Sequence, residues 1–205
     1  MTRSTPLYLF VMAALFAAMY GSLVAWRHSS LPHPAAVHAN SAPVGFTDQN
    51  GQSFDWDSLA GHVWIGSFFY TSCPTICWRQ NLALAAVQRE TAGSDIRLVS
   101  ITCDPAQDTP AVLKTYAERL EADPARWTFL TGKLADIIRL GTDRFGVSVE
   151  QGTHSDRAVV FDADGKNRGS FRTTVPEDVA RMQKLLSNLT SPAPVGQPDA
   201  TPSPR

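Results

Sequence analysis

Cys73 and Cys77, separated by three residues, are the side chains with the clearest capacity for chemistry in this sequence. Proline is favoured in the first turn of a helix, so Pro74 predicts a helix with Cys73 as its cap and Cys77 one turn along the same face. A thiol at the amino end of a helix meets the positive end of the helix dipole, which lowers its pKa and enriches the thiolate. Since the thiolate is both a nucleophile and a metal ligand, the pair predicts a functional site.

This spacing is compatible with a metal site and with a redox pair. Both sulfurs can reach one ion, because the cysteines lie about one helical turn apart. Two thiolates suit Cu(I) or zinc; one added imidazole gives a low-coordinate site that suits copper, whereas zinc takes a fourth ligand. A disulfide also fits, because Cα atoms one turn apart lie near the top of the usual range of about 4.4–6.8 Å. A bridge that closes so short a loop stabilises little, so a purely structural bridge is disfavoured.

His154 is the histidine best placed to supply a third ligand. It lies in a polar loop, residues 151–157, directly before a predicted strand, so its ring could lean over the start of the helix. A lone loop histidine is more often simply solvated, and the residues alone leave both interpretations open. His62 is expected at the surface. Three further histidines fit the composition of a linker: His28, His33 and His38.

Cys103, Asp104 and Asp108 follow the next predicted strand, residues 96–102. Ligand sites in open α/β sheets gather at the carboxyl ends of strands, so Cys103 is expected near the cysteine pair as a third thiol, or else as a small buried hydrophobe. Asp104 is a candidate for orienting His154 or for accepting hydrogen bonds from loop amides. Asp108 is expected to cap the helix that follows.

The elements that position these residues alternate along the chain. Apolar patterns predict strands at residues 63–70, 96–102, 158–161 and 168–171, and helices at residues 74–90, 110–120, 133–145 and 176–189. Residues 46–54 predict a hairpin that turns at Asn50-Gly51, a pair that accepts positive φ angles. Parallel strands with helical crossovers, then an antiparallel pair and a helix, predict an α/β domain of thioredoxin-like fold with an N-terminal hairpin.

The chain has 205 residues, which is enough for a membrane anchor and one domain. Residues 6–26 carry no charge and are about as long as a bilayer core requires, so they predict a single transmembrane helix after a short tail, residues 1–5. A cleaved signal peptide is the alternative. A tether, residues 27–43, leads to the domain, residues 44–190, and the proline-rich residues 191–205 are expected to be disordered.

The overall charge is nearly balanced. Lys and Arg number 18 against 19 Asp and Glu, so the net charge is -1. No global positive field would hold a nucleic acid, and a metal, a small molecule or a protein is the expected partner.

Several motifs, in order along the chain, resemble those of the Sco/SenC family of copper metallochaperones. Residues 70–77 (YTSCPTIC) resemble the copper motif of that family, and residues 104–110 (DPAQDTP) resemble its following signature. Residues 129–132 (FLTG) match a later stretch, as does His154-Ser155 ahead of the turn at residues 162–165 (DADG). The resemblance extends from the anchor through the whole domain.

The resemblance implies that Cys73, Cys77 and His154 bind copper, as Cu(I) or Cu(II), in a thioredoxin-like domain. It implies a chaperone more than an enzyme, one that serves the copper centre of cytochrome c oxidase from a single-pass membrane position with the domain on the extracytoplasmic side. A thiol-disulfide oxidoreductase, or a redox or copper sensor, that uses the same cysteine pair is the alternative. Cys103 departs from the family pattern, in which an aliphatic residue commonly precedes the Asp-Pro pair.

Overall fold

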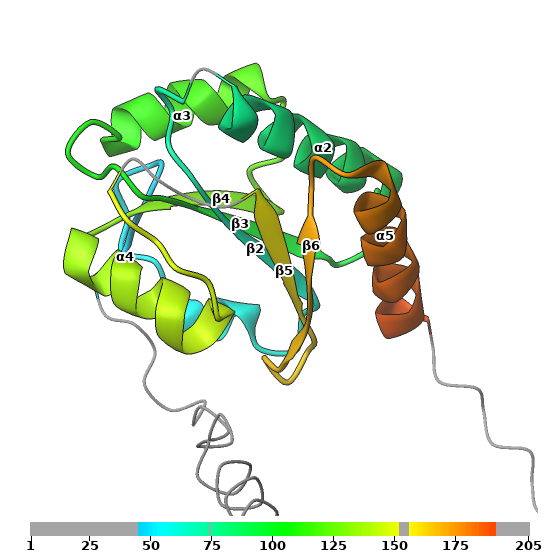
Figure 1. Ribbon diagram of the computed structural model, residues 1–205. Coiled ribbons are helices and arrows are strands. Elements are labelled where there is room, and N and C mark those ends of the chain that lie inside the picture. Colours follow the sequence, from blue (N-terminus) through cyan, green and yellow to red (C-terminus); the bar gives the residue numbers. More distant parts are fainter. Residues whose placement is uncertain (1–44, 74, 152–155, 192–205) are drawn as a thin grey trace, which may run out of the picture. The chain divides into compact units, whose positions relative to one another are not determined.

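The computed structural model describes residues 45–73, 75–151 and 156–191, which form a mixed sheet with helices packed on both faces (Figure 1). The strands are β1 (Thr47–Asp48), β2 (Trp64–Phe69), β3 (Arg97–Thr102), β4 (Trp127–Thr131), β5 (Arg157–Phe161) and β6 (Asn167–Arg172). The helices are α2 (Ile76–Glu90), α3 (Pro110–Arg119), α4 (Leu134–Leu140) and α5 (Pro176–Thr190), with a 3-10 turn at Trp56–Leu59 and a π-helical turn at Gly141–Phe145. The strand order is β1-β4-β3-β2-β5-β6. β2, β3 and β4 are parallel, and the other pairings are antiparallel.

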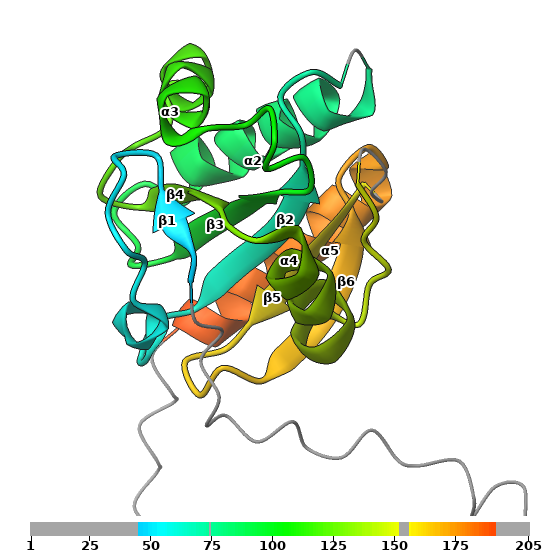
Figure 2. The same cartoon turned by 90° about the vertical axis from the view of Figure 1, so that its left-hand side faces the viewer.

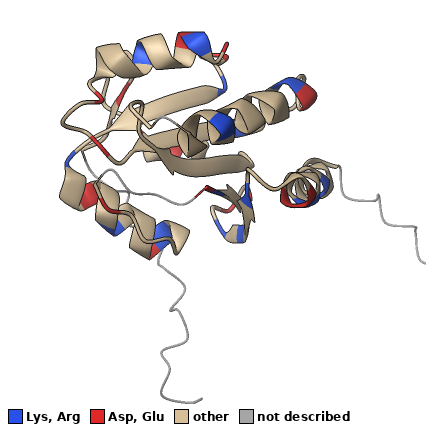
Figure 3. Cartoon of the chain, turned by 45° about the horizontal axis from the view of Figure 1, so that its top comes forward, with Lys and Arg blue, Asp and Glu red and all other residues tan. Residues whose placement is uncertain are grey.

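β2 lies at the centre of the sheet and is covered on both faces (Figure 2). All six of its residues are buried, and none is charged, whereas charged side chains lie mainly on helices and loops (Figure 3). Its side chains alternate between two cores. Ile65 and Phe69 join the core with α2, α3 and α5, whereas Trp64 and Phe68 join the core with α4. This two-sided burial explains why the predicted strand is an almost continuous apolar run.

Gly66 lies in the middle of β2 because an aromatic ring occupies the space that a side chain would need. A Cβ atom at this position would lie 2.2 Å from a ring carbon of Phe145. The Phe145 ring also packs edge-on against Phe68 and Phe161, with centroids 4.9 and 5.1 Å away. The close approach therefore joins the π-helical turn directly to the centre of the sheet.

The predicted N-terminal hairpin is present. Its turn lies at Asn50-Gly51, where Gly51 adopts a φ of 80°, and a bridge between Thr47 and Ser53 joins the two arms. The first arm also pairs with β4, which places the hairpin at the edge of the sheet.

The Gln49 side chain extends this edge pairing beyond the two residues of β1. Its amide oxygen accepts a hydrogen bond from the Phe129 N–H at 2.9 Å, and its amide nitrogen donates to the Trp127 carbonyl at 3.5 Å. Gln49 is itself buried. The side chain thus occupies backbone groups that an edge strand would otherwise leave open to another chain.

β4 was not predicted from the sequence, and two predicted helices have different limits. β4 is short and its threonines interrupt the apolar pattern, so only its parallel pairing with β3 reveals it as a strand. The helix predicted at residues 133–145 consists of α4 and the π-helical turn. The helix predicted to begin at residue 74 begins at Ile76.

The predicted membrane anchor, residues 6–26, lies outside the described residues, as do the tail before it, the tether, and residues 192–205. Among the residues that the structure does describe, no helix combines the length and the apolar character needed to cross a bilayer.

Candidate metal centre

The cysteine turn, residues 70–73, connects β2 to the helix that carries Cys77. The Cys73 N–H donates to the Tyr70 carbonyl at 3.3 Å and closes the turn. The Cys77 N–H then donates to Cys73 Sγ at 3.4 Å. Cys73 is partly exposed, whereas Cys77 is fully buried. The structure therefore brings both cysteines together at the start of α2.

The residue that precedes α2 is Thr75, so the prediction that Cys73 occupies the cap position is wrong. Thr75 has φ of -136° and ψ of -74°, and its side chain makes no capping hydrogen bond. These angles lie outside the helical region, so the helix does not extend back toward Cys73. The Cys73 sulfur nevertheless accepts an amide hydrogen of the first helical turn, which is what a capping side chain does.

Burial controls the acidity of Cys77. It raises the pKa of this thiol well above its ordinary value, and the hydrogen bond with Cys73 raises the pKa further. The helix dipole was expected to lower the pKa of a thiol in this position, but the Cys77 side chain is 0% exposed and desolvation outweighs the dipole. In the metal-free protein Cys77 is therefore a neutral thiol at neutral pH, and a metal must displace its proton.

Two tyrosines border the cysteines, and neither was predicted as part of the site. A hydrogen bond with Cys73 raises the pKa of the Tyr70 hydroxyl, and burial adds to this effect. Tyr116 of α3 stacks on Phe69 with centroids 5.2 Å apart and accepts a hydrogen bond from Asn81 Nδ2 at 3.1 Å. Burial raises the pKa of Tyr116 to about 12. Tyr70 is the first residue of the motif at residues 70–77, whereas only the packing of α2 against α3 reveals Tyr116.

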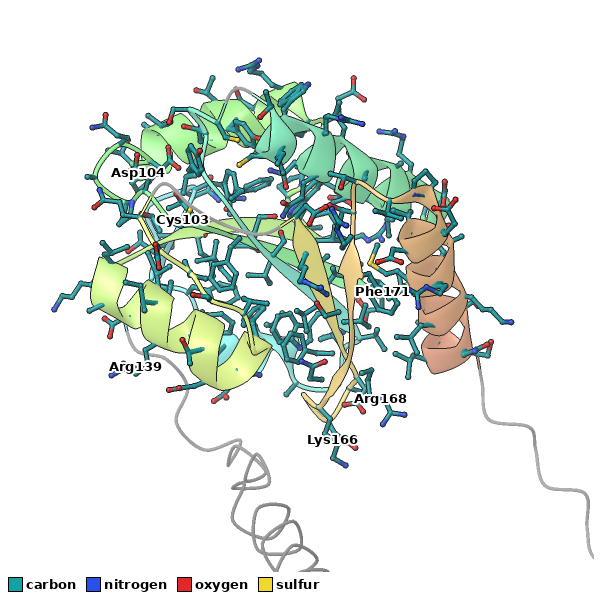
Figure 4. All side chains as sticks on the ribbon, viewed as in Figure 1. Cys103, Asp104, Arg139, Lys166, Arg168 and Phe171 are labelled. Atoms are coloured by element: carbon teal, nitrogen blue, oxygen red, sulfur yellow. The ribbon has the colours of Figure 1, made fainter. Side chains whose placement is uncertain are left out.

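Cys103 follows β3 and is buried on the other side of the sheet from Cys77. Its N–H donates to the Phe69 carbonyl at 2.7 Å, and it belongs to the core that contains Val99 and Ile101. A negative charge on Cys103 would raise the pKa of Cys77, though less than burial does. Cys103, directly before Asp104 at the end of β3 (Figure 4), is thus the small buried residue of the second interpretation, and its role as a third thiol stays a prediction.

The aspartate loop, residues 103–109, follows β3 and meets the cysteine turn. The Asp108 side chain is buried, and its carboxylate accepts hydrogen bonds from the Thr71 N–H at 3.0 Å, from the Thr71 hydroxyl and from the Thr102 hydroxyl. The prediction that Asp108 caps α3 is wrong, because Thr109 is the cap residue and its hydroxyl accepts a first-turn amide hydrogen at 3.5 Å. Asp108 turns inward because three donors meet it there.

Asp104 makes more exposed contacts at the other end of the same loop. Its N–H donates to Thr102 Oγ1 at 3.0 Å, and its carboxylate accepts a hydrogen bond from the Gln151 amide at 3.3 Å. Gln151 precedes His154 by three positions in the sequence. His154 lies outside the described residues, so its contact with Asp104 stays a prediction.

The two cysteine sulfurs are the described part of the predicted ligand set. In residues 45–73, 75–151 and 156–191, no group of three or more His, Cys, Asp or Glu side chains is arranged to hold a metal ion. Cysteine sulfurs are soft donors, and that chemistry suits Cu(I). The three-ligand set of Cys73, Cys77 and His154 stays a prediction.

An open cavity of about 430 Å³ lies beside the cysteine turn. It is lined by Thr71 and by the α3 residues Ala111, Val112, Thr115, Tyr116 and Arg119. Val112 is 40% exposed, and the Arg119 guanidinium lies 4.9 Å from the ring centre of Trp78. The cysteine turn is thus bordered by accessible surface of mixed apolar and basic character.

Two thiols at the carboxyl end of a central parallel strand, in a sheet flanked by helices on both faces, define a thioredoxin-like protein with a two-cysteine site. The chain belongs to the SCO1/SenC family, whose family model matches residues 35–189. The resemblance seen in the sequence motifs is confirmed.

Individual relatives agree with this assignment. The SCO1 protein homolog of Bacillus subtilis is 34% identical over 120 residues, which cover 57% of this chain and 62% of that protein, less than two thirds of its length. The structure of BsSco, a member of the Sco family of cytochrome c oxidase assembly proteins with an identified disulfide switch, has a TM-score of 0.61 at 27% identity and covers 71% of this chain and 91% of that one. The structure of Bradyrhizobium japonicum ScoI with copper bound has a TM-score of 0.57 at 28% identity, and the match covers 69% of this chain and 96% of that one. These similarities confirm the thioredoxin-like fold.

Proposed function

We propose that this chain is a copper metallochaperone that binds copper through Cys73, Cys77 and His154 and delivers it to the copper centre of cytochrome c oxidase. The observation that carries the proposal is the pair of cysteine sulfurs at the start of α2, joined through the Cys77 N–H at 3.4 Å, in a member of the SCO1/SenC family. Copper bound to ScoI and the role of BsSco in oxidase assembly support the cargo and the target.

The unequal exposure of the two cysteines suggests how copper would leave the site. Cys73 is partly exposed and Cys77 is fully buried, so an incoming thiolate of the target meets the ion from the side of Cys73. Exchange would proceed stepwise, with one bond to the target forming as one bond to the chaperone breaks. Release of the ion from Cys77 is then assisted by return of a proton, because the buried thiol favours its neutral form.

The sequence supports a position at the membrane for this activity. The uncharged residues 6–26 would form a single-pass anchor, with the domain on the extracytoplasmic side. A compartment-sensitive reporter fused after residue 190 tests this topology, and a reporter that is active only in the cytoplasm would reverse the orientation.

The second candidate function is thiol-disulfide exchange at the same pair, which the disulfide switch of BsSco supports. In this scheme the Cys73 thiolate attacks a target disulfide and releases one target thiolate. Cys77 then attacks the Cys73 sulfur, releases the second target thiolate, and leaves the chaperone pair oxidised. The raised pKa of the buried Cys77 thiol opposes its attack on Cys73 and its binding of a metal alike, so a variant is needed to separate the two functions.

A paired assay on one variant separates the two functions. His154→Ala should weaken copper binding, measured by competition with a chelator, and should leave the reduction of a model disulfide unchanged. His62→Ala is the matched control, because His62 lies away from the cysteines and contacts Asp95 at 2.7 Å. Wild-type copper affinity together with lost disulfide reduction in His154→Ala would replace the chaperone with the oxidoreductase.

A further inference from the structure

Asp108 is a buried carboxylate that the proposed copper chemistry does not use. Its side chain is 0% exposed, and it takes part in no ion pair within the described residues. Burying a carboxylate is unfavourable unless hydrogen bonds replace its water. Here they come from two places, the backbone and hydroxyl of Thr71 and the hydroxyl of Thr102. The three donors explain how a buried carboxylate is stabilised, and the elements that they belong to indicate its role.

The two threonines belong to different elements, and Asp108 connects them. Thr102 is the last residue of β3 and is paired with Phe69 at the end of β2. Thr71 is in the cysteine turn, two residues before Cys73. The carboxylate therefore ties the turn that presents Cys73 to the carboxyl end of β3.

The bond from Thr71 to Asp108 is stronger than the backbone contact that closes the turn at Cys73. The Cys73 N–H reaches the Tyr70 carbonyl at 3.3 Å, which is long for a hydrogen bond to oxygen, and the Cys73 sulfur, a weak acceptor, accepts the Cys77 N–H at 3.4 Å. The Thr71 N–H, by contrast, is held by a carboxylate at 3.0 Å, and bonds to charged acceptors are the stronger ones.

We propose that Asp108 is a positioning residue for the copper site, which acts through Thr71 to hold the cysteine turn so that Cys73 Sγ faces Cys77. The inference rests on the proposed copper function for its cargo, but the mechanical role stands on the contacts of the metal-free protein. It assigns Asp108 to the site rather than to the cap of α3.

A matched pair of threonine variants separates positioning from general stabilisation. Thr71→Val and Thr102→Val each remove one hydroxyl that donates to the same carboxylate, and Thr102→Val also removes the acceptor of the Asp104 N–H. If Asp108 is purely structural, copper affinity should follow stability, so Thr102→Val should lose at least as much affinity as Thr71→Val. A positioning Asp108 predicts that both lower the urea midpoint, whereas Thr71→Val alone lowers copper affinity, by about tenfold or more, as for other residues that orient ligands.

The copper measurement uses the full chain in detergent, reduced and titrated with Cu(I) against a chelator. The absorption of the Cu(II)-thiolate bond is recorded in parallel, since a displaced Cys73 sulfur changes that band and a loss of stability does not. We expect a shifted band in Thr71→Val and in Asp108→Asn, and a wild-type band in Thr102→Val. Equal copper affinities in the two threonine variants would overturn the proposal.

A copper-free measurement keeps the inference separate from the proposed function. Amide hydrogen exchange of the metal-free chain should show faster exchange at Thr71 and Cys73 in Asp108→Asn, with wild-type exchange along β3. If the wild-type chain binds no copper, the chaperone function fails while this exchange pattern still shows that Asp108 holds the turn. Wild-type exchange at Thr71 in Asp108→Asn would overturn the positioning role whatever the copper result.

Discussion

The cysteine turn and the aspartate loop follow neighbouring parallel strands and meet at the same edge of the sheet, yet they are built differently. The aspartate loop bonds to itself: the Gln107 and Asp108 N–H groups both donate to the Asp104 carbonyl, at 3.1 and 2.9 Å. In the cysteine turn the Cys73 N–H donates to the Tyr70 carbonyl at 3.3 Å, and the Thr71 N–H donates to Asp108 in the neighbouring loop at 3.0 Å. The loop that carries the two candidate ligands thus relies on a contact with its neighbour, and the aspartate loop supplies that contact through Asp108.

This division suits a site whose ligands must exchange. A thiolate that releases copper to a partner has to move relative to its neighbours. The bond from Thr71 to Asp108 lies between Cys73 and the end of β2, where Phe69 is paired with Thr102 of β3. The candidate ligand Cys73 and the carboxylate that holds its turn, Asp108, thus lie in different loops.

The largest expected effect follows from the loss of a candidate copper ligand, Cys77. Cys77→Ser replaces a soft sulfur with a hard oxygen while the aspartate loop keeps its contacts. Copper affinity should fall by more than the roughly 10–100-fold that follows loss of residues behind the ligands. Chelator competition measures the affinity, and metal analysis should show less than one copper per chain. Zinc bound in preference to copper by the wild-type chain would contradict the assignment of the site.

The second prediction concerns the contact between the two loops, which Asp108 provides. Asp108→Ala leaves the Thr71 N–H and two hydroxyls without their acceptor, and each buried group that loses its partner costs about 1–3 kcal/mol. The free energy of unfolding should fall by about 3 kcal/mol in urea titrations. Asp104→Ala is the matched control: its carboxylate contact with Gln151 is exposed, so the loss should stay within about 0.5 kcal/mol. Equal losses would show that burial of Asp108 does not matter.

Much of this architecture could be predicted from the sequence, because periodicity and turn residues act locally. The apolar run of β2, the turn at Asn50-Gly51 and the order of the strands and helices all followed from such patterns. β4 was missed because two threonines mask a five-residue strand that only its pairing with β3 defines. The cysteine pair was predicted as a site from its place between a strand and a helix.

The contacts that organise the site could not be predicted, because they join residues far apart in the chain. Asp108 and Thr71 are separated by 37 positions, and a helix cap was the local alternative for an aspartate at this point. Thr109 fills that capping role one residue later, which left Asp108 available to turn inward. Likewise, the acidity of Cys77 depends on how deeply the first turn of α2 is buried, and no local pattern reports that depth.

The third prediction sharpens the comparison at Cys103, the thiol that belongs to the aspartate loop. Cys103→Ala removes one buried atom from the core that contains Val99 and Ile101, and the free energy of unfolding should fall by about 1 kcal/mol. Copper should still bind at one ion per chain with wild-type affinity, because the Cys103 side chain belongs to the opposite core from Cys77. Loss of copper binding in this variant would make Cys103 a third sulfur ligand and would place ligands in both loops.

The smallest expected effect concerns pH, and it tests whether Cys77 is as buried in solution as its contacts indicate. Burial raises the pKa of the folded Cys77 thiol, whereas in the unfolded chain this thiol ionises near its ordinary pKa of about 8.5. The neutral folded thiol therefore contributes stability that is fully present below pH 8.5 and declines as the pH rises, because the unfolded state loses its proton first. Between pH 7 and pH 9 the metal-free, reduced protein should lose about 0.8 kcal/mol more stability than a Cys77→Ala variant, whose residue 77 does not titrate. Urea titrations of the two proteins at both pH values give this difference, and the subtraction removes the contributions of groups that do not interact with Cys77. An identical pH dependence would mean that Cys77 ionises as readily in the folded chain as in the unfolded one, so that both cysteines, and not Cys73 alone, would be open to solvent.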